Sequence, residues 1–249
     1  MNETFRPLSE NGFQFRCDPD VSCFTECCAR LQLTLTPYDI LRMKHRLGLS
    51  SEAFLDQYSE PFVKKGSRFP MVKLKMMAEE GGRCPFVTAE GCAIYEDRPG
   101  ACRLYPVGRA SAAVADQKGA REKFFLVVEL HCRGFNENTQ WTLEEWLKHE
   151  GVSAYNAMND AWLQILSSPK SLGSNRHVQQ KQQMFFMASY NLDTFRRFVF
   201  ESPFLKRFDV SSERCEKLAS DDVELMTFGF EWLKFSLFGE TTVRPRMEK

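Results

Sequence analysis

The sequence predicts an α+β protein whose two parts differ in character. Residues 13–134 are expected to form a small, loop-rich, cysteine-dense domain with a few short strands and helices, and residues 135–249 an all-helical domain or extension. Two observations favour this division. Eight of the nine cysteines, and most Pro and Gly residues, precede residue 135. All four Trp residues and the long helical patterns follow it, so the junction is expected at residues 134–140.

The elements of the first part follow from caps and periodicity. Residues 36–39 (Thr-Pro-Tyr-Asp) combine an N-cap, a proline at the first helical position and an acid in the first turn, so a helix is expected from there to Gly48. Ser51 begins a second short helix. Residues 70–76 alternate apolar and basic side chains, which indicates a half-buried strand. Residues 123–130 (KFFLVVEL) predict a further strand, because Phe and Val favour strands.

The second part is dominated by helical signals. Thr142 and Glu145 form a capping box that opens a helix. The aromatic residues of the later segments recur at the spacing of a buried helix face, which favours core packing over a cofactor pocket or a docking surface. Further helices are predicted over residues 154–166, 178–190, 192–200, 212–218 and 221–238.

Composition narrows the class of protein and its compartment. With 249 residues, 43% hydrophobic, and 22 Phe, the chain can build a core without disulfides, unlike small secreted domains. Residues 1–15 lack the basic segment followed by an apolar segment that is typical of a secretory signal peptide. No apolar stretch reaches the ~18 residues that a membrane span needs. We therefore expect a cytoplasmic protein with reduced thiols and no membrane partner. The 33 basic and 33 acidic residues balance, which argues against a nucleic-acid partner.

The first cysteine group is compact enough to surround a metal from one loop. Cys17, Cys23, Cys27 and Cys28 have the spacing C-x5-C-x3-C-C. Thiolates are soft ligands that favour zinc, copper(I) or iron–sulfur clusters over hard cations. Adjacent side chains in extended backbone point to opposite sides, so Cys27 and Cys28 cannot both hold one small ion without a turn. One of the pair can ligate one centre while the other faces a second centre or the core.

The second cysteine group lies among prolines and a glycine. Prolines at positions 85, 99 and 106 favour rigid, non-helical loops, which suit ligands whose positions are fixed before the ion binds. Cys132, directly after the strand predicted at 123–130, completes eight thiols, enough for two four-thiolate sites or for one cluster with spare cysteines. The predicted metal ligands are thus Cys17, Cys23, Cys27, Cys28, Cys84, Cys92, Cys102 and Cys132.

Other polar residues near the cysteines have two interpretations each. Arg98 and Arg103 could neutralise the negative charge of a metal–thiolate centre, or could form surface salt bridges. His131 could replace a thiolate, although a histidine at a strand end is more often solvated or hydrogen-bonded. Cys215, alone in a helical segment, is expected to be a small core residue.

The cysteine pattern resembles the YkgJ-type cysteine-cluster family. The resemblance rests on the early cysteines ending in Cys27-Cys28 and on the later strings CPF (84–86), GCxIY (91–95) and RPxxCRxYP (98–106), and it covers about residues 13 to 134. The family is described as a zinc- or iron-chelating domain with a CxxCxxCC signature, and its members are often labelled Fe–S oxidoreductases. Here the gaps before Cys23 and Cys27 are longer, and Glu26 precedes the pair, so the early ligands stay open.

The resemblance implies metal binding, and two classes of function follow. One is an iron–sulfur protein, with a 4Fe–4S cluster and a redox or modification-related role, working with a redox or protein partner that the sequence does not identify. The other is a zinc-chelating structural or interaction module without catalysis. Flagellin lysine methylase shares the cysteine pattern, which makes a modifying activity conceivable, yet no glycine-rich nucleotide motif supports it. Other catalytic motifs are also missing from the sequence, and the catalytic residues of any enzyme activity stay unknown.

Overall fold

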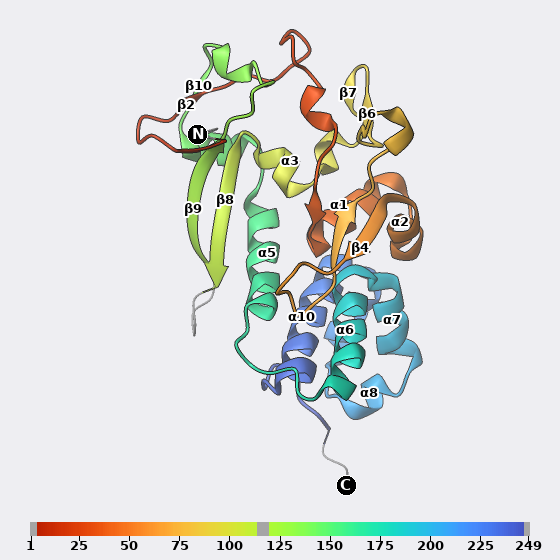
Figure 1. The fold of residues 1–249 in the computed structure, drawn as a ribbon. Coiled ribbons are helices and arrows are strands. Elements are labelled where there is room, and N and C mark those ends of the chain that lie inside the picture. Colours follow the sequence, from red (N-terminus) through yellow and green to blue (C-terminus); the bar gives the residue numbers. More distant parts are fainter. Residues whose placement is uncertain (1–3, 114–119, 247–249) are drawn as a thin grey trace.

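The structure is a computed structural model that describes residues 4–113 and 120–246. Its mixture of helices and short strands confirms the predicted α+β class, with helices dominating the second half of the chain. The cysteine-bearing segment forms the upper part of the molecule in Figure 1, and the later helices form the lower part. Within the described ranges, no helix is long and apolar enough to cross a membrane.

The first two helices match their sequence signals. Helix α1 (Pro37–Leu47) begins at a capping box, in which Thr36 Oγ1 accepts a hydrogen bond from the Asp39 backbone N–H and the Asp39 carboxylate accepts one from the Thr36 N–H. It ends at Gly48, whose φ of 64° is the left-handed conformation that glycine adopts without a Cβ clash. Helix α2 spans Ser51–Tyr58 and is capped by Ser50.

Short antiparallel strands surround these helices. The predicted strand at 70–76 is found as β5 (Met71–Leu74), the centre of a sheet with the order β3-β5-β4. The strand predicted at 123–130 is β9, which starts and ends three residues earlier and lies at the centre of the order β1-β9-β8. Strand β9 spans Ala120–Val127. The other strands are β1 (Phe5–Pro7), β2 (Phe13–Gln14), β3 (Thr34–Leu35), β4 (Ser59–Phe62), β6 (Val87–Thr88), β7 (Gly91–Cys92), β8 (Val107–Ala113) and β10 (Gln140–Trp141).

The second half is helical apart from β10, which pairs with β2. The predicted capping box at Thr142 and Glu145 opens α4, and the other predicted helices are found within about three residues of the expected ends. The helices are α4 (Leu143–His149), α5 (Ser153–Leu166), α6 (Asn175–Tyr190), α7 (Leu192–Glu201), α8 (Phe204–Arg207), α9 (Ser212–Ser220) and α10 (Asp222–Phe238).

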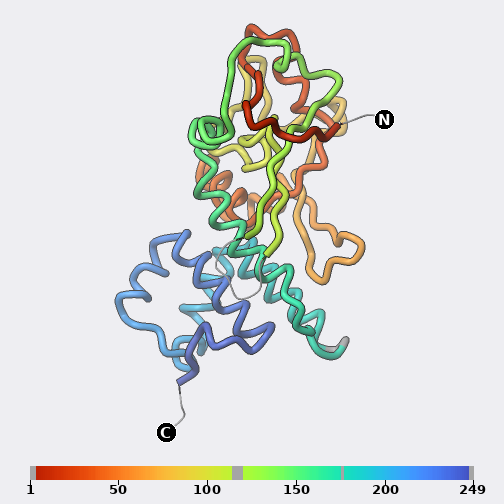
Figure 2. The backbone as a smooth tube through the Cα atoms, turned by 90° about the vertical axis from the view of Figure 1, so that its left-hand side faces the viewer, coloured from red at the N-terminus to blue at the C-terminus, as the bar shows by residue number. Residues whose placement is uncertain are grey.

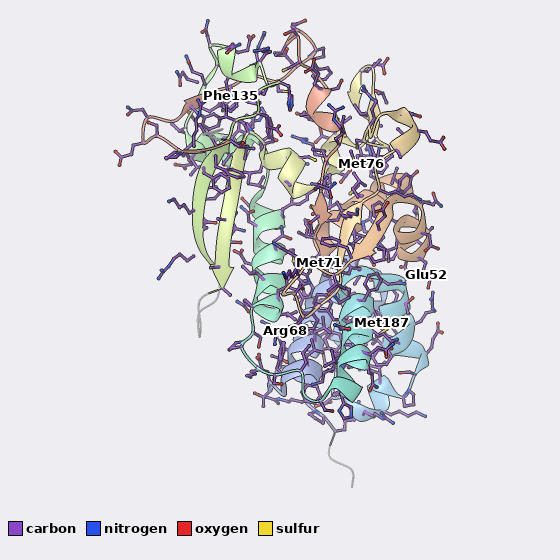
Figure 3. All side chains as sticks on the ribbon, in the orientation of Figure 1. Glu52, Arg68, Met71, Met76, Phe135 and Met187 are labelled. Atoms are coloured by element: carbon purple, nitrogen blue, oxygen red, sulfur yellow. The ribbon has the colours of Figure 1, made fainter. Side chains whose placement is uncertain are left out.

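One hydrophobic core contains residues from both halves. Phe69, just before β5, stacks on Phe185 of α6 with ring centroids 4.2 Å apart, and both side chains are almost completely buried. Nearby, Arg68 donates hydrogen bonds to the carbonyls of Lys170 and Ser168, where the upper part meets the lower helices (Figure 3). Figure 2 shows α5 running between these two parts. The domain boundary near residue 134 stays a prediction.

A buried lysine adds an electrostatic link between the same parts. Lys44 of α1 is 4% exposed, and its Nζ lies 2.8 Å from Asp222 Oδ2 and 3.4 Å from Asp193 Oδ1. Asp222 begins α10, and Asp193 lies in the first turn of α7. Helix α1, which positions part of the cysteine region, is therefore fixed against the C-terminal helices by charge as well as by apolar contacts.

Candidate metal centre

The eight predicted ligands come from four separate segments. The loop of residues 17–28 lies between the β6–β7 hairpin and the turn that follows β9 (Figure 1). The hairpin region carries Cys84 and Cys92, and the turn carries Cys132. Cys102 lies on α3 (Gly100–Leu104), so the expectation of a non-helical loop between the prolines was wrong there. Proline is tolerated at the N-cap of α3 because the helix needs no N–H there, and the Pro99 carbonyl still accepts a hydrogen bond from the Arg103 N–H at 2.9 Å.

Cys27 and Cys28 lie on a tight turn rather than in extended backbone. They belong to the 3-10 helix η1 (Glu26–Cys28), which follows Thr25 in a left-handed conformation with φ of 67°. The Cys28 thiol interacts with the Cys27 sulfur, which raises the pKa of Cys28 and lowers that of Cys27. On the other side, the Cys84 backbone N–H donates to the Cys28 carbonyl at 2.8 Å. The turn thus places Cys28 beside the second cysteine group.

One set of thiols, here called the inner group, gathers around Cys102. Burial raises the pKa of Cys102 strongly, and the charges of Cys84, Asp39, Cys92 and Cys27 raise it further. The pKa of Cys28 is raised first by its contact with the Cys27 sulfur and by burial, and then by the charges of Cys27, Cys102 and Cys84. Cys92 is paired with Val87 across the β6–β7 hairpin, which brings it next to the Cys84 loop. The inner group consists of Cys28, Cys84, Cys92 and Cys102.

A second set of thiols, the outer group, gathers around Cys27. Cys17 is exposed, and partial desolvation followed by the charges of Cys27, Cys132 and Cys23 raises the pKa of its thiol. The Arg133 backbone N–H donates to the Cys23 sulfur at 3.0 Å, which places Cys23 against the turn of Cys132. The pKa of Cys132 is raised by its burial and by Cys23 and Cys27. The outer group consists of Cys17, Cys23, Cys27 and Cys132.

Two residues that the sequence analysis did not connect with the thiols support these groups. The Tyr105 hydroxyl is buried and interacts with the Cys132 sulfur without the geometry of a full hydrogen bond, and burial followed by this contact raises the pKa of Tyr105. The buried Asp39 carboxylate accepts the Gly100 N–H at 2.7 Å and so fixes the start of α3, which carries Cys102. Tyr105 lies in the RPxxCRxYP string that the sequence analysis singled out. Asp39 was assigned only to the N-terminal cap of α1, so its contact with Gly100 was not predicted.

The thiols are near one another but not yet in ligand geometry. In the described ranges, no three Cys, His, Asp or Glu side chains converge closely enough to hold a metal ion as they stand. Raised pKa values keep most of these thiols protonated at neutral pH, and protonated thiols have no charge that a cation could neutralise. A bound metal would have to displace these protons, and the sulfurs would have to move closer together to ligate it. The donor set, eight thiols with every cysteine free, fits soft metals such as zinc, or an iron–sulfur cluster.

The two arginines beside Cys102 act mainly on protein groups. Arg103 is buried, and its guanidinium donates to the backbone carbonyls of Glu150 and Glu96, both at 2.6 Å. Arg98 is also buried, forms an ion pair with the Glu150 carboxylate and stacks 3.7 Å from the centre of the Tyr95 ring. Of the two interpretations from the sequence, the surface salt bridge does not apply to either arginine, because both side chains are buried. Of the thiols, Cys92 is affected by Arg98, which opposes the increase in its pKa caused by burial.

The remaining candidates lie at the edge of the thiol groups or outside them. His131 Nε2 is 3.6 Å from Glu129 Oε2, and the side chain is 37% exposed. Cys215 lies on α9, where its thiol donates a weak hydrogen bond to the Val210 carbonyl at 3.9 Å. The predicted core role of the aromatic helix segments is confirmed by Phe204, which is buried and packs against Trp232.

Comparison with known proteins gives one match. Residues 16–133 match the family model named CxxCxxCC, which is described as a "putative zinc- or iron-chelating domain". Comparisons with curated proteins and with solved structures gave no match. The matched range contains all eight clustered cysteines and both thiol groups, as the sequence resemblance implied. Residues 16–133 of this chain, slightly less than half of it, therefore carry the domain that the CxxCxxCC family model describes.

Proposed function

We propose that this chain is an iron–sulfur protein of the cytoplasm, in which the clustered thiolates hold 4Fe–4S clusters and support a redox or modification-related reaction with a protein partner. The observation that carries the proposal is that eight thiols from four segments lie near enough to one another to affect each other's pKa. Free cysteines at this density are rare unless they bind a metal or react. All nine cysteines are free in the structure, which agrees with a reducing compartment.

The two groups have the composition of two four-thiolate centres. The inner group, Cys28, Cys84, Cys92 and Cys102, and the outer group, Cys17, Cys23, Cys27 and Cys132, each supply the four thiolates that one cluster or one zinc ion requires. Cys27 and Cys28 are neighbours on the η1 turn, and we assign Cys27 to the outer centre and Cys28 to the inner one. Eight thiolates exceed what a single structural zinc ion needs.

Contacts to the sulfurs favour a redox role. The Arg133 N–H donates to Cys23, and the Tyr105 hydroxyl interacts with Cys132. Hydrogen bonds to cluster sulfurs and burial of the site are the means by which a protein adjusts the potential of an iron–sulfur cluster. When bound, the cluster would supply the electron, and these donors would stabilise its more negative, reduced form.

The alternative is a zinc-chelating structural module. Two closed four-thiolate sets leave no open position for a substrate, which is the arrangement of structural zinc sites. In that case the helical half would carry the function, and the metal would hold together loops that have little regular structure of their own.

The identity of the metal separates the two. The full-length protein, purified without oxygen, is analysed for iron, sulfide and zinc, and its visible absorption spectrum is recorded. The proposal predicts iron and sulfide in equal amounts and a coloured protein that bleaches on reduction. Colourless protein with stoichiometric zinc would support the structural alternative, because Zn²⁺ is d¹⁰. Protein that holds neither metal after anaerobic reconstitution would contradict both.

A further inference from the structure

A charged hollow opens directly beside the thiol groups. Its volume is about 480 Å³, within the usual range for small-molecule sites. Glu26 precedes Cys27, Arg83 precedes Cys84 and His131 precedes Cys132 in the chain, and all three line the hollow. Arg30 and Glu80 complete its charged lining. A ligand in this hollow would therefore lie next to loops that carry cysteines of both groups.

The charges around the hollow are not paired with one another. Arg30 and Arg83 make no side-chain hydrogen bond or ion pair within the described ranges, and neither do Glu26 and Glu80. The Nε2 atom of His131 is buried and makes no hydrogen bond among the described residues. Elsewhere charged side chains that meet are paired, as in the Arg214 cluster with Glu224 and Glu231. The two cations and two anions of the hollow are exposed, so both signs are accessible to a ligand.

The backbone places one of the arginines at a conformational cost. Arg30 has φ of 55°, a left-handed conformation that side chains other than glycine rarely adopt. It is held there because its N–H donates to the Gly82 carbonyl at 2.6 Å, next to the bridge between Ala29 and Arg83. A Cβ on Gly82 would lie 3.1 Å from Arg30 Cγ, so glycine makes room for the stem of the arginine. Strained residues that the surrounding structure fixes in place are typical of functional sites.

We infer that this hollow binds a zwitterionic small molecule of the amino-acid or dipeptide class. The ligand carboxylate pairs with Arg30 and Arg83, and the ligand ammonium group pairs with Glu26 and Glu80. Arginine suits the first role because its planar guanidinium matches a carboxylate in two-pronged hydrogen bonds. Binding at this hollow rests on the proposed function in one respect, because a bound metal would hold the loops that form the hollow. An iron–sulfur cluster and a zinc ion would serve this purpose equally.

Three dipeptides of one size test the requirement for both charges. Calorimetric titration of the metal-loaded full chain uses L-alanyl-L-alanine, its N-acetyl derivative, which is only an anion, and its C-terminal amide, which is only a cation. The inference predicts saturable binding of the zwitterion and at least tenfold weaker binding of each singly charged derivative. Absence of saturable zwitterion binding, or equal binding of either derivative, would overturn it.

Charge variants locate the binding and separate it from metal loading. Arg30→Gln and Glu80→Gln should each weaken binding of the zwitterion at least tenfold, whereas Arg46→Gln, at an exposed and unpaired arginine of α1, should leave it unchanged. Metal content is measured for every variant. If Arg30→Gln loses metal, Glu80→Gln decides, because Glu80 lies on η2 (Ala78–Glu80) and not beside a cysteine. Binding that survives in a fully metal-loaded Glu80→Gln variant would refute the assignment of this site. A protein without metal would instead count against the proposed function.

Discussion

The buried ion pair between Arg98 and Glu150 gives a prediction whose size follows from the structure. Arg98 comes from the string around Cys102, and Glu150 ends α4, so the pair fixes the inner thiol group against the helical half. Their side chains are 10% and 4% exposed. In Glu150→Leu, the guanidinium would keep the Tyr95 carbonyl, 2.6 Å away, and the Tyr95 ring, but lose its counter-charge. Breaking a buried pair in this way costs about 3–5 kcal/mol. We expect about 3 kcal/mol, since the Tyr95 contacts remain.

A second substitution tests the electrostatic reason for that loss. In Arg98→Met/Glu150→Leu, no buried charge is left without a partner, so most of the stability should return. The matched control is Glu52→Leu, because the pair of Glu52 and Arg197 is about half exposed and should contribute far less to stability than a buried pair.

The assay is urea unfolding of the metal-loaded protein under reducing, oxygen-free conditions, followed by far-UV circular dichroism and by tryptophan fluorescence. Coincidence of the two probes shows whether one free energy of unfolding describes each variant. A loss in Glu150→Leu as small as that of the Glu52 control would refute the reasoning. So would a double variant no more stable than Glu150→Leu, because the loss would then come from packing rather than from an unpaired charge.

Three further predictions concern the metal, the two halves and pH. Cys102→Ser should lose metal and melt at a lower temperature, whereas Cys215→Ser should keep its metal; equal metal contents would contradict the ligand assignment. Chelation under reducing conditions should raise amide hydrogen exchange over residues 84–106 far more than over α10, and a uniform rise would show one cooperative unit. The pKa of Asp222 lies below its ordinary value of 3.8, because hydrogen bonds from Lys44 and other cations outweigh burial. Because this carboxylate has a lower pKa in the folded than in the unfolded chain, it stabilises the fold above pH 3.8, and this stabilisation is lost as the pH falls through the folded-state pKa. The melting temperature should therefore drop below about pH 4. Asp222→Asn should flatten this drop, and an unchanged pH profile would count against the network.

Local signals in the sequence were sufficient for most helices. The cap at Thr36, the glycine at position 48 and the capping box at Thr142 act over a few residues, so each helix begins near the place that they predict. Strand β8 was missed because its sequence, VGRASAA, is rich in small residues with little strand preference. It forms because β9 pairs with it along its whole length.

The arrangement of the candidate site depends on contacts that the sequence does not display. The number of thiols could be read from the sequence, whereas the separate roles of Cys27 and Cys28 stay a prediction. Which thiols share a group could not be predicted, because the groups arise from distant pairings, such as the hydrogen bond from the Cys84 N–H to the Cys28 carbonyl. The roles of Arg98 and Arg103 likewise depend on Glu150, a residue of another element. When a polar residue pairs with a residue far away in the sequence, the sequence around it does not indicate which residue that partner is.

The most direct test of the two-centre account is native mass spectrometry of the full-length protein, purified without oxygen. The account predicts two metal centres in the wild-type chain. It predicts one in Cys92→Ser, which removes a ligand of the inner group, and one in Cys23→Ser, which removes a ligand of the outer group. A wild-type chain with a single centre would contradict the account, and so would a pair of variants that both lose all metal or both keep all of it.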